Sequence, residues 1–428
     1  MTGLIAVLAF DELWKVGKYV YYGLLASQNR GQDRYFAAVS DGEKLNVFED
    51  DLNYLQINGS KLLNSNGHVG IGGTFTSNEL HRVKYSYLRE GWVEVAVIVD
   101  GIVDKDLTTL CRDLIKLMKS GNSLAEAFAE VVKGIHGIYS LICLSNRGEL
   151  IAYRSTPGLR PLHIGSYGFD LAIVSTESTP ISILGGDLKR SVRPGELVCI
   201  TPEYVKSFTI KDNGRPALCS FEYIYMARPD SILDGIDVYH VRKSLGYQLA
   251  SKFKHDVDIV VGVPDTALPY AIGFATALNK ELDLGFISTG SKLRTAIKED
   301  PKDRLIGIQL KLNPIRCVLS RRRVALVDDS LVRGVTIKNV VQILRNKLGV
   351  KEVHVVIGSP KLRFSCPYGM EIPPSDELLS ANLDEALSTK YVEADSLTWL
   401  SAENVIELFN KYGVNLCLGC FLRSHLIG

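Results

Sequence analysis

The chain has 428 residues, of which 46% are hydrophobic and 23% are charged, and its formal net charge is +1 at pH 7. These proportions are ordinary for a folded protein of two or three domains. So small a net charge creates no global field that would recruit nucleic acid or an anionic membrane, and no apolar run reaches the roughly 20 residues of a membrane span. We therefore expect neither partner.

The chain begins with MTGLIAVLAFDELWK, which does not resemble a signal peptide. It lacks a basic segment before the apolar run, and it reaches Asp11 and Glu12 early. We therefore expect a cytoplasmic protein. Thiols stay reduced in that compartment, so the eight cysteines indicate buried thiols or metal ligands more than disulfides.

The first half of the chain is rich in short strand-like runs. They cover residues 4–10, 34–40, 68–75, 93–101, 139–145, 150–155, 171–176 and 196–201. Helical patterns lie between them, at 16–27 and 106–132, and glycine turns interrupt the sequence repeatedly. This arrangement is typical of an α+β domain with layered sheets.

The second half alternates buried strands with helices. Residues 258–265, 323–329 and 352–359 are apolar strand runs, which predicts a parallel sheet built from βαβ units. A helix is predicted from Ile337 to Leu348, closed by Gly349, and an amphipathic helix at 401–413. We expect the domain boundary within 221–235, which divides the chain into residues 1–225 and 226–428.

The turn after the strand Val324–Val327 carries the strongest chemical signal. Ligands of parallel sheets lie at the carboxyl ends of the strands, and backbone N–H groups that open a helix can hold a phosphate. Carboxylates repel phosphate but suit sugar hydroxyls or a magnesium ion. A phosphorylated ribose with Mg²⁺ combines these features. The residues concerned are Asp328, Asp329, Ser330, Arg333, Gly334 and Thr336.

A simpler alternative is a capped helix after a strand, with its acids solvated. Two acids followed by the pattern S-x-x-R-G-x-T favour the ligand site over this alternative.

The run VALVDDSLVRGVT closely resembles the phosphoribosylpyrophosphate (PRPP) motif of type I phosphoribosyltransferases, in the form found in the glutamine PRPP amidotransferase family. The resemblance covers essentially the whole chain. It implies an α+β N-terminal-nucleophile (class II glutamine amidotransferase) domain followed by an α/β type I phosphoribosyltransferase domain with a cluster-binding tail. Other segments similar to the family are 21–33, 67–77, 154–165, 193–201, 219–239 and 311–315.

Four cysteines match positions that hold a [4Fe–4S] cluster in the iron–sulfur members of that family. Alone, the C-x-x-C at 417–420 is a weak signal, and four thiolates suit either an iron–sulfur cluster or zinc. The resemblance favours iron–sulfur, with Cys219, Cys366, Cys417 and Cys420 as ligands. The remaining cysteines are most simply core thiols.

The predicted glutaminase site departs from the family at three positions. Thr2 stands where the family has cysteine, although an N-terminal threonine can be a nucleophile once Met1 is removed. Asp100 aligns with the oxyanion asparagine, and a carboxylate there repels the developing charge. Phe75 aligns with the arginine that binds the glutamine carboxylate, which a phenyl ring cannot pair. We expect no glutaminase activity.

The predicted transferase site is better kept. Its pyrophosphate loop reads Pro264-Asp265-Thr266-Ala267, with alanine in place of a glycine, which matters if the loop needs a positive φ or a close approach by pyrophosphate. Val335 replaces a threonine. In the flexible loop Arg294 and Thr295 match, but the lysine is displaced, with Lys292, Lys298 and Lys302 close by. The predicted substrate residues are therefore Asp265, Thr266 and Arg294 besides the residues of the 328–336 turn.

Three functional hypotheses follow from these departures. The first is an amidophosphoribosyltransferase of purine synthesis that binds PRPP and Mg²⁺ and uses free ammonia or ammonia from a separate glutaminase. The second is an inactive paralogue that binds PRPP or purine nucleotides and regulates an intact partner. The third is a protein in which fold and cluster survive for assembly alone. The resemblance also implies a homo-oligomer.

Overall fold

The computed structural model describes residues 1–428 except 53–54, 56–58, 77–82, 211–215, 289–311 and 424–428. The chain divides into two compact units. The N-terminal unit comprises residues 1–219, 230–236 and 367–371, and the C-terminal unit comprises 220–229, 237–366 and 372–428. The predicted boundary at 225/226 lies within residues 220–229, the first segment that belongs to the C-terminal unit.

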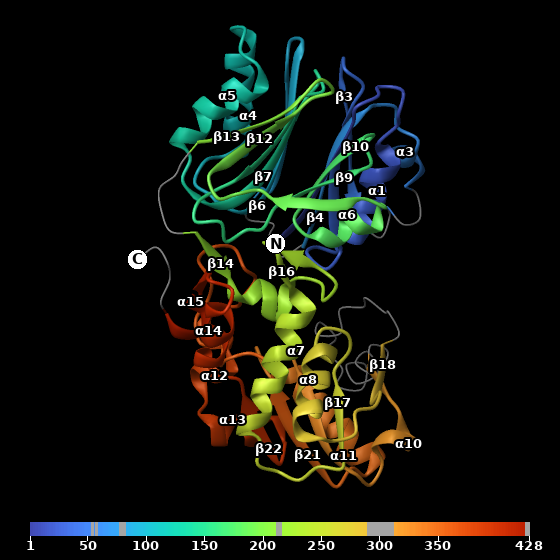
Figure 1. Cartoon of the computed structure of the whole chain (residues 1–428), viewed down its shortest axis with the longest axis vertical. Helices are drawn as coiled ribbons and strands as arrows, with labels where there is room; N and C mark the ends of the chain where they lie inside the picture. The colour runs from blue at the N-terminus through green and yellow to red at the C-terminus, as the bar shows by residue number, and fades with distance from the viewer. Residues whose placement is uncertain (53–54, 56–58, 77–82, 211–215, 289–311, 424–428) are drawn as a thin grey trace. The chain divides into compact units, whose positions relative to one another are not determined.

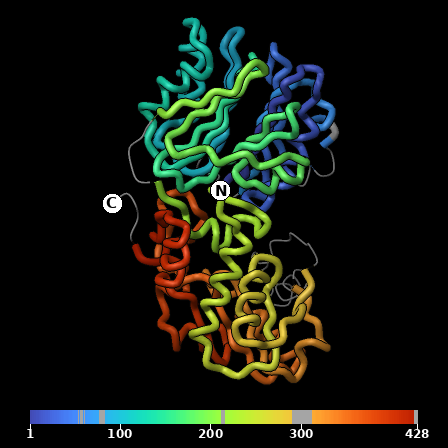
Figure 2. The backbone as a smooth tube through the Cα atoms, in the orientation of Figure 1, coloured from blue at the N-terminus to red at the C-terminus, as the bar shows by residue number. Residues whose placement is uncertain are grey.

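Two sheets form the centre of the N-terminal unit (Figures 1 and 2). The seven-stranded sheet has the order β11-β9-β10-β1-β4-β2-β3, and the six-stranded sheet has the order β13-β12-β8-β7-β6-β5. The strands are β1 (Thr2–Ala9), β2 (Arg34–Ser40), β3 (Leu45–Asp51), β4 (Val69–Phe75), β5 (Tyr85–Glu90), β6 (Val93–Val103), β7 (Gly137–Ser145), β8 (Leu150–Arg154), β9 (His163–Tyr167), β10 (Leu171–Ser175), β11 (Asp187–Ser191), β12 (Glu196–Ile200) and β13 (Val205–Thr209).

Side-chain alternation along β1 shows why the sheets stack. Leu4, Ala6 and Leu8 enter a core that contains residues of both sheets. Ile5 and Val7 point to the opposite face and pack under α1 (Gly17–Ala26) and α6 (Ser178–Ile183). Because successive residues of a strand face opposite sides, a run that is apolar throughout must be covered on both faces.

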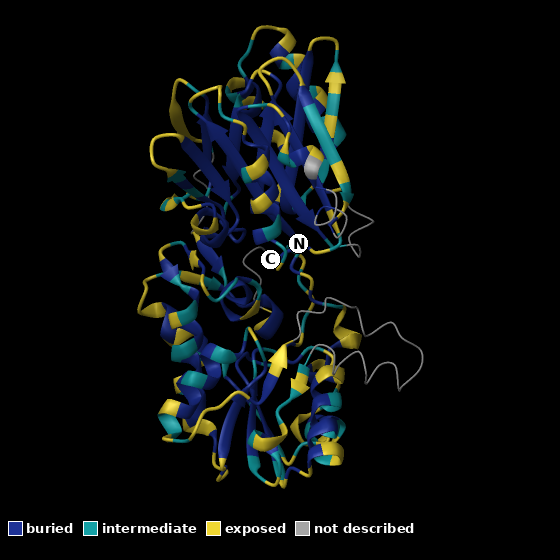
Figure 3. Ribbon diagram, turned by 90° about the vertical axis from the view of Figure 1, so that its right-hand side faces the viewer, coloured by how far each residue is buried: buried dark blue, intermediate teal, exposed yellow. Residues whose placement is uncertain are grey.

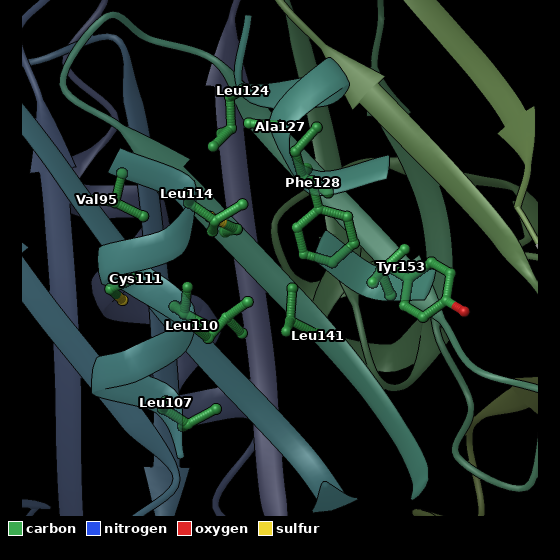
Figure 4. Packing of buried hydrophobic residues seen from close by; sticks show 14 of the residues in the cluster. Val95, Leu107, Leu110, Cys111, Leu114, Leu124, Ala127, Phe128, Leu141 and Tyr153 are labelled. Carbon is green, nitrogen blue, oxygen red and sulfur yellow. The ribbon is translucent and has the colours of Figure 1, made fainter. Parts of the chain in front are cut away.

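The six-stranded sheet is covered in the same way by α4 (Leu107–Lys119) and α5 (Leu124–Val131), as Figure 4 shows. Leu110, Leu114 and Phe128 of these helices pack on Val95 and Leu141 of the sheet. The N-terminal unit is thus a four-layer arrangement of helices, sheet, sheet and helices. The central strands of its sheets, such as β1 and β4, are buried, whereas the edge strand β13 is exposed (Figure 3). The predicted layered α+β domain agrees with this arrangement.

The C-terminal unit is built on a parallel sheet of order β17-β20-β21-β22. Its strands are β17 (Ile259–Gly262), β20 (Arg323–Asp328), β21 (Glu352–Ile357) and β22 (Ser396–Trp399), and all three neighbouring pairs are parallel. Helix α11 (Val335–Leu348) covers one face, whereas α8 (Leu268–Leu278) contacts β17 and β20 and packs on α7 (Val238–Leu249). The predicted parallel βαβ sheet is therefore present.

Further short elements complete the two units. They are α3 (Ser60–Leu63), β14 (Ala217–Cys219), β15 (Ile232–Leu233), β16 (Ile236–Asp237), β18 (Phe286–Ser288), β19 (Leu312–Pro314), α10 (Arg316–Leu319), α12 (Leu379–Asn382), α13 (Glu385–Val392), α14 (Ala402–Asn410), β23 (Asn415–Cys417) and α15 (Gly419–Leu422). Among the described residues, no helix combines the length and the apolar character that crossing a membrane requires.

Candidate functional site

Two loops meet at the carboxyl edge of the parallel sheet. Strands β17 and β20 are neighbours in register, with Gly262 beside Val327. The loop after β17 contains Asp265 and Thr266, and the turn after β20 contains Asp328 and Asp329. The Thr266 hydroxyl donates a hydrogen bond to Asp329 Oδ2. Two segments that are 63 residues apart in sequence are thus joined where a ligand of a parallel sheet would lie.

The two acids of this turn carry an electrostatic cost. Burial and the neighbouring Asp329 carboxylate raise the pKa of Asp328 well above its usual value. Burial also raises the pKa of Asp329, although hydrogen bonds from Thr266 and Ser330 partly offset that effect. Paired carboxylates in such surroundings favour a cation or hydroxyl donors as partners. This observation fits Mg²⁺ or ribose hydroxyls.

The backbone that follows leaves its donors available. No described residue accepts a hydrogen bond from the backbone N–H groups of residues 330–334. Gly334 has φ +76° at the start of α11, and a Cβ there would lie 3.1 Å from Leu379 and Tyr391 side-chain atoms. Exposed backbone N–H groups in such a turn can surround an anion. The turn therefore suits a phosphate.

The other predicted residues of this site are placed as follows. Arg333 is exposed and ion-paired with Glu377, and Thr336 is exposed on the first turn of α11. Asp265 is exposed, and the Pro264–Asp265 peptide bond is cis. Arg294 belongs to the segment 289–311, outside the described residues, as do Thr295 and the nearby lysines Lys292, Lys298 and Lys302.

Ala267 bears on whether the pyrophosphate loop requires glycine. It has φ −88° and ψ −9°, in the right-handed region that any residue adopts, and it is the N-cap of α8. A positive φ is therefore not required at this position. The substitution of glycine by alanine does not distort the loop through its backbone angles.

Arg242 is a residue of the site region that the sequence analysis did not identify. It is fully buried on α7, where its guanidinium donates to the backbone oxygens of Tyr223 (2.8 Å) and Ala227 (2.7 Å). Its charge acts to lower the pKa of Asp329, against the effect of burial. An arginine within the apolar face of a helix, between Val241 and Leu245, was the available signal.

The predicted nucleophile region lies where β1, β4 and β6 come together in the N-terminal unit. Thr2 is fully buried and pairs with Phe75 across the β1–β4 ladder. The backbone N–H of Thr2 donates to Asp100 Oδ1 at 2.9 Å. Thr2 therefore lies beside both Phe75 and Asp100.

Two oxygens at this place are buried without partners. Neither Thr2 Oγ1 nor Asp100 Oδ2 has a hydrogen-bond partner among the described residues. Phe75 is 6% exposed, and its ring lies 5.2 Å from that of Tyr85. A buried apolar ring thus stands at position 75, where the family resemblance implies an arginine for the glutamine carboxylate.

The predicted cluster cysteines come from three chain segments. Cys417 and Cys420 are buried, and Cys219 and Cys366 are half-buried. The Cys420 carbonyl accepts hydrogen bonds from the N–H groups of Arg363 and Phe364, close in sequence to Cys366. Ser220, which follows Cys219, donates from its hydroxyl to the Cys417 carbonyl at 2.7 Å.

These hydrogen bonds join the segment before Cys366 to Cys420, and Ser220 to Cys417. In the described part of the chain, however, no group of three or more His, Cys, Asp or Glu is gathered as a metal site. The contrasting core thiols Cys111 and Cys199 are disfavoured as thiolates, because burial raises their pKa to about 12 and about 11.

Known proteins are similar to the chain over nearly its whole length. An amidophosphoribosyltransferase of Bacillus subtilis is 33% identical, covering 99% of this chain and 93% of the relative. An amidophosphoribosyltransferase of Synechococcus elongatus is 31% identical, covering 98% and 90%. No family model matches the chain.

Solved structures agree with these relatives. The structure of glutamine PRPP amidotransferase from Bacillus subtilis complexed with ADP and GMP has a TM-score of 0.88 and 30% identity, and it covers 99% of this chain and 97% of that chain. This match confirms the predicted fold class, an N-terminal-nucleophile domain followed by a phosphoribosyltransferase domain. Since the similarity extends through both units, the chain belongs to the amidophosphoribosyltransferase family.

Proposed function

We propose that this chain transfers ammonia to C1 of PRPP, as an enzyme of purine biosynthesis. The observation that carries the proposal is the meeting of Thr266 and Asp329 at the carboxyl edge of the sheet. The N–H groups of residues 330–334 would hold the 5-phosphate, and Asp328 and Asp329 the ribose hydroxyls or Mg²⁺. Asp265, Thr266 and Arg294 would bind near the pyrophosphate.

The proposed reaction needs little covalent chemistry from the protein. The ammonia lone pair forms the N–C1 bond while the bond from C1 to the pyrophosphate oxygen breaks. Pyrophosphate leaves with both electrons, and the new ammonium group releases a proton to water. The residues of this site act by positioning PRPP and by compensating charge that develops on the leaving group. Bound Mg²⁺ would neutralise part of the pyrophosphate charge.

The ammonia, we propose, comes from solution or from another protein. Three features support this source: a threonine at the nucleophile position, a carboxylate at the oxyanion position and the buried Phe75 ring where a cation would bind substrate. Each removes a different requirement of glutamine hydrolysis.

A [4Fe–4S] cluster held by Cys219, Cys366, Cys417 and Cys420 is part of the proposal, with the hydrogen bonds around Cys417 and Cys420 as its support. Its role would be to hold three chain segments together, and no step of the reaction passes through it. Purine nucleotides are proposed as further ligands, because the similar Bacillus subtilis structure is complexed with ADP and GMP. We also propose a cytoplasmic homo-oligomer.

The inactive-paralogue alternative has less support. The curated relatives carry the name of the enzyme, and the acids of the 328–336 turn are kept. No observation favours association with an intact copy over catalysis.

The deciding experiment is pyrophosphate release from PRPP and Mg²⁺ by anaerobically purified protein, with ammonium and glutamine in parallel. We expect release with ammonium alone. Asp329→Asn should abolish it, whereas Asp376→Asn, an exposed acid of the same unit, should leave it unchanged. Release with glutamine would contradict the proposed loss of glutaminase activity. If pyrophosphate is released with neither ammonium nor glutamine, while PRPP still raises the melting temperature of the protein, the ligand-binding paralogue would be favoured.

A further inference from the structure

The N-terminal backbone enters a buried, charged environment. Met1 is 2% exposed, and its ammonium group is ion-paired with Glu371 of the 367–371 segment. One residue further on, the Thr2 nitrogen lies 2.9 Å from Asp100 Oδ1. In a chain that keeps Met1, this nitrogen is a neutral amide. In a chain from which Met1 has been removed, this nitrogen is an α-amine.

The charges around the buried Asp100 side chain favour its ionised form. Burial alone would raise its pKa, but the charges of Arg160, Arg30, the chain terminus and Lys84 outweigh burial, so the pKa of Asp100 lies below its ordinary value. One carboxylate oxygen contacts the Thr2 nitrogen, and the other has no hydrogen-bond partner among the described residues. A buried carboxylate with unused acceptor capacity favours a cation as its neighbour.

We propose that Asp100 is the counter-ion of the Thr2 α-ammonium group in the processed chain, and that this buried ion pair prevents activation of the N-terminal hydroxyl. The inference rests on the proposed function and adds a reason why glutamine would not be hydrolysed. Asp100 would have two effects: it repels an oxyanion, and it acts as a positioning residue for the amine.

The surrounding charges do not reverse this assignment. Arg30 is 2.5 Å from the Glu177 carboxylate, which compensates its charge. Lys84 donates to the Gly101 carbonyl at 2.7 Å, and Arg160 donates to the Tyr368 carbonyl at 2.8 Å. Glu371 adds a second negative charge near the chain terminus. Because Coulomb energy falls with distance, the carboxylate in direct contact with the nitrogen dominates.

The chemical consequence concerns the general base. In N-terminal nucleophile hydrolases, the free α-amine takes the hydroxyl proton so that the oxygen can attack. An ammonium group has no lone pair and cannot accept that proton. Among the described residues no side chain accepts a hydrogen bond from Thr2 Oγ1, so none takes the place of that base. A single carboxylate at position 100 would therefore remove the base and the oxyanion site together.

The test is competitive labelling of the full chain with a trace acylating reagent between pH 6 and pH 10. Intact mass spectrometry first establishes whether Met1 is removed, and labelling of the N-terminal peptide is then quantified at each pH. We expect the Thr2 amine to be labelled at pH 7 about tenfold or more faster in Asp100→Asn than in the wild type, because loss of an opposite charge shifts titration by about one pH unit or more.

Asp187→Asn is the matched control, since Asp187 is an exposed acid of the same unit, and it should label as the wild type does. Retention of Met1, or equal labelling of the wild type and Asp100→Asn, would overturn the proposal. If Asp100→Asn does not fold, the wild type alone provides the test. A pH of half-maximal labelling above the ordinary α-amine pKa of about 8 supports the ion pair, and one at or below that pKa overturns the proposal. Labelling reports the charge of the Thr2 amine without turnover of any substrate. Glutamine-dependent pyrophosphate release would therefore refute the proposed loss of glutaminase activity separately.

Discussion

Thr266 donates a hydrogen bond to Asp329 and thereby joins the loop after β17 to the turn after β20. Neither residue belongs to a regular strand or helix. The parallel register of the two strands brings the loops together, and the hydrogen bond then orients the Asp329 carboxylate, whose other oxygen accepts from Ser330 at 2.7 Å. The geometry of the proposed PRPP site therefore depends on a side-chain contact between its two halves.

Thr266→Val should impair transfer without unfolding the protein. Valine keeps the shape of threonine but removes the donor to a charged group, which costs about 1.5–3 kcal/mol. We expect kcat/KM for PRPP with ammonium to fall about 10- to 100-fold. Thr276→Val is the matched control, because Thr276 is exposed on α8 and its hydroxyl donates to the Ile272 carbonyl of the same helix. Equal effects of the two substitutions would show that the contact with Asp329 does not matter.

Asp328→Asn should stabilise the ligand-free protein and abolish its activity. Burial and Asp329 raise the pKa of Asp328, so its contribution to stability is full below the unfolded value and is lost as the pH rises through the folded value. At neutral pH the buried pair of acids therefore lowers the stability of the ligand-free protein. We expect the melting temperature to rise by about 2–4 °C, or ~1 kcal/mol.

Magnesium provides the internal check on that result. Bound Mg²⁺ should stabilise the wild type more than Asp328→Asn, so the difference in melting temperature should narrow when EDTA is replaced by Mg²⁺. Asp376→Asn should have the melting temperature of the wild type both in EDTA and in Mg²⁺. A wild type that is more stable than Asp328→Asn in EDTA would contradict the electrostatic argument.

The sequence alone predicted those elements whose pattern is strictly periodic. The strand Val324–Val327 and the helix to Leu348 are present as β20 and α11, and Gly349 adopts φ +63° as the C-cap. The helical stretch predicted at 106–132 is instead two helices. Gly121, with φ +104°, and the capping box between Ser123 and Glu126 interrupt it. The glycine turn and the new helix cap end the first helix there, although the amphipathic pattern continues on both sides.

Features that depend on distant contacts were not readable from the sequence. The segment 367–371 belongs to the N-terminal unit although the surrounding chain belongs to the C-terminal unit, and the strand β22 was not predicted. The contact between Thr266 and Asp329 required strand order, which periodicity does not specify. Arg242 was missed because a single arginine in a helix is usually read as a solvated side chain.

Asp234→Asn should destabilise the N-terminal unit. Arg154 Nη1 and Nη2 contact the two Asp234 oxygens at 2.6 and 2.9 Å, and the arginine side chain is 1% exposed. Removing one partner of a buried pair leaves a buried charge without compensation, which costs about 3–5 kcal/mol. We expect a loss of about 3 kcal/mol in denaturant unfolding followed by a probe of this unit, whereas Asp187→Asn should be neutral.

The same pair predicts a pH dependence. Burial raises the pKa of Asp234, but Arg154 outweighs burial and holds the pKa below its usual value. The stabilisation is therefore present above the unfolded value of about 4 and is lost as the pH falls through the folded value. Below pH 4 the wild type should lose stability more steeply than Asp234→Asn. Parallel plots of stability against pH for the two proteins would show that Asp234 does not keep its charge in the folded unit.

Cys417→Ser should remove the proposed cluster while Cys317→Ser preserves it. Cys417 is buried and its carbonyl is fixed by Ser220, whereas Cys317 is exposed elsewhere in the same unit. Loss of one thiolate leaves three ligands for a centre that takes four. Iron content and visible absorption of anaerobically purified protein should both fall in Cys417→Ser and stay unchanged in Cys317→Ser. Stoichiometric zinc in place of iron would retain the four-thiolate site but refute the iron–sulfur assignment, and metal-free wild type would refute both.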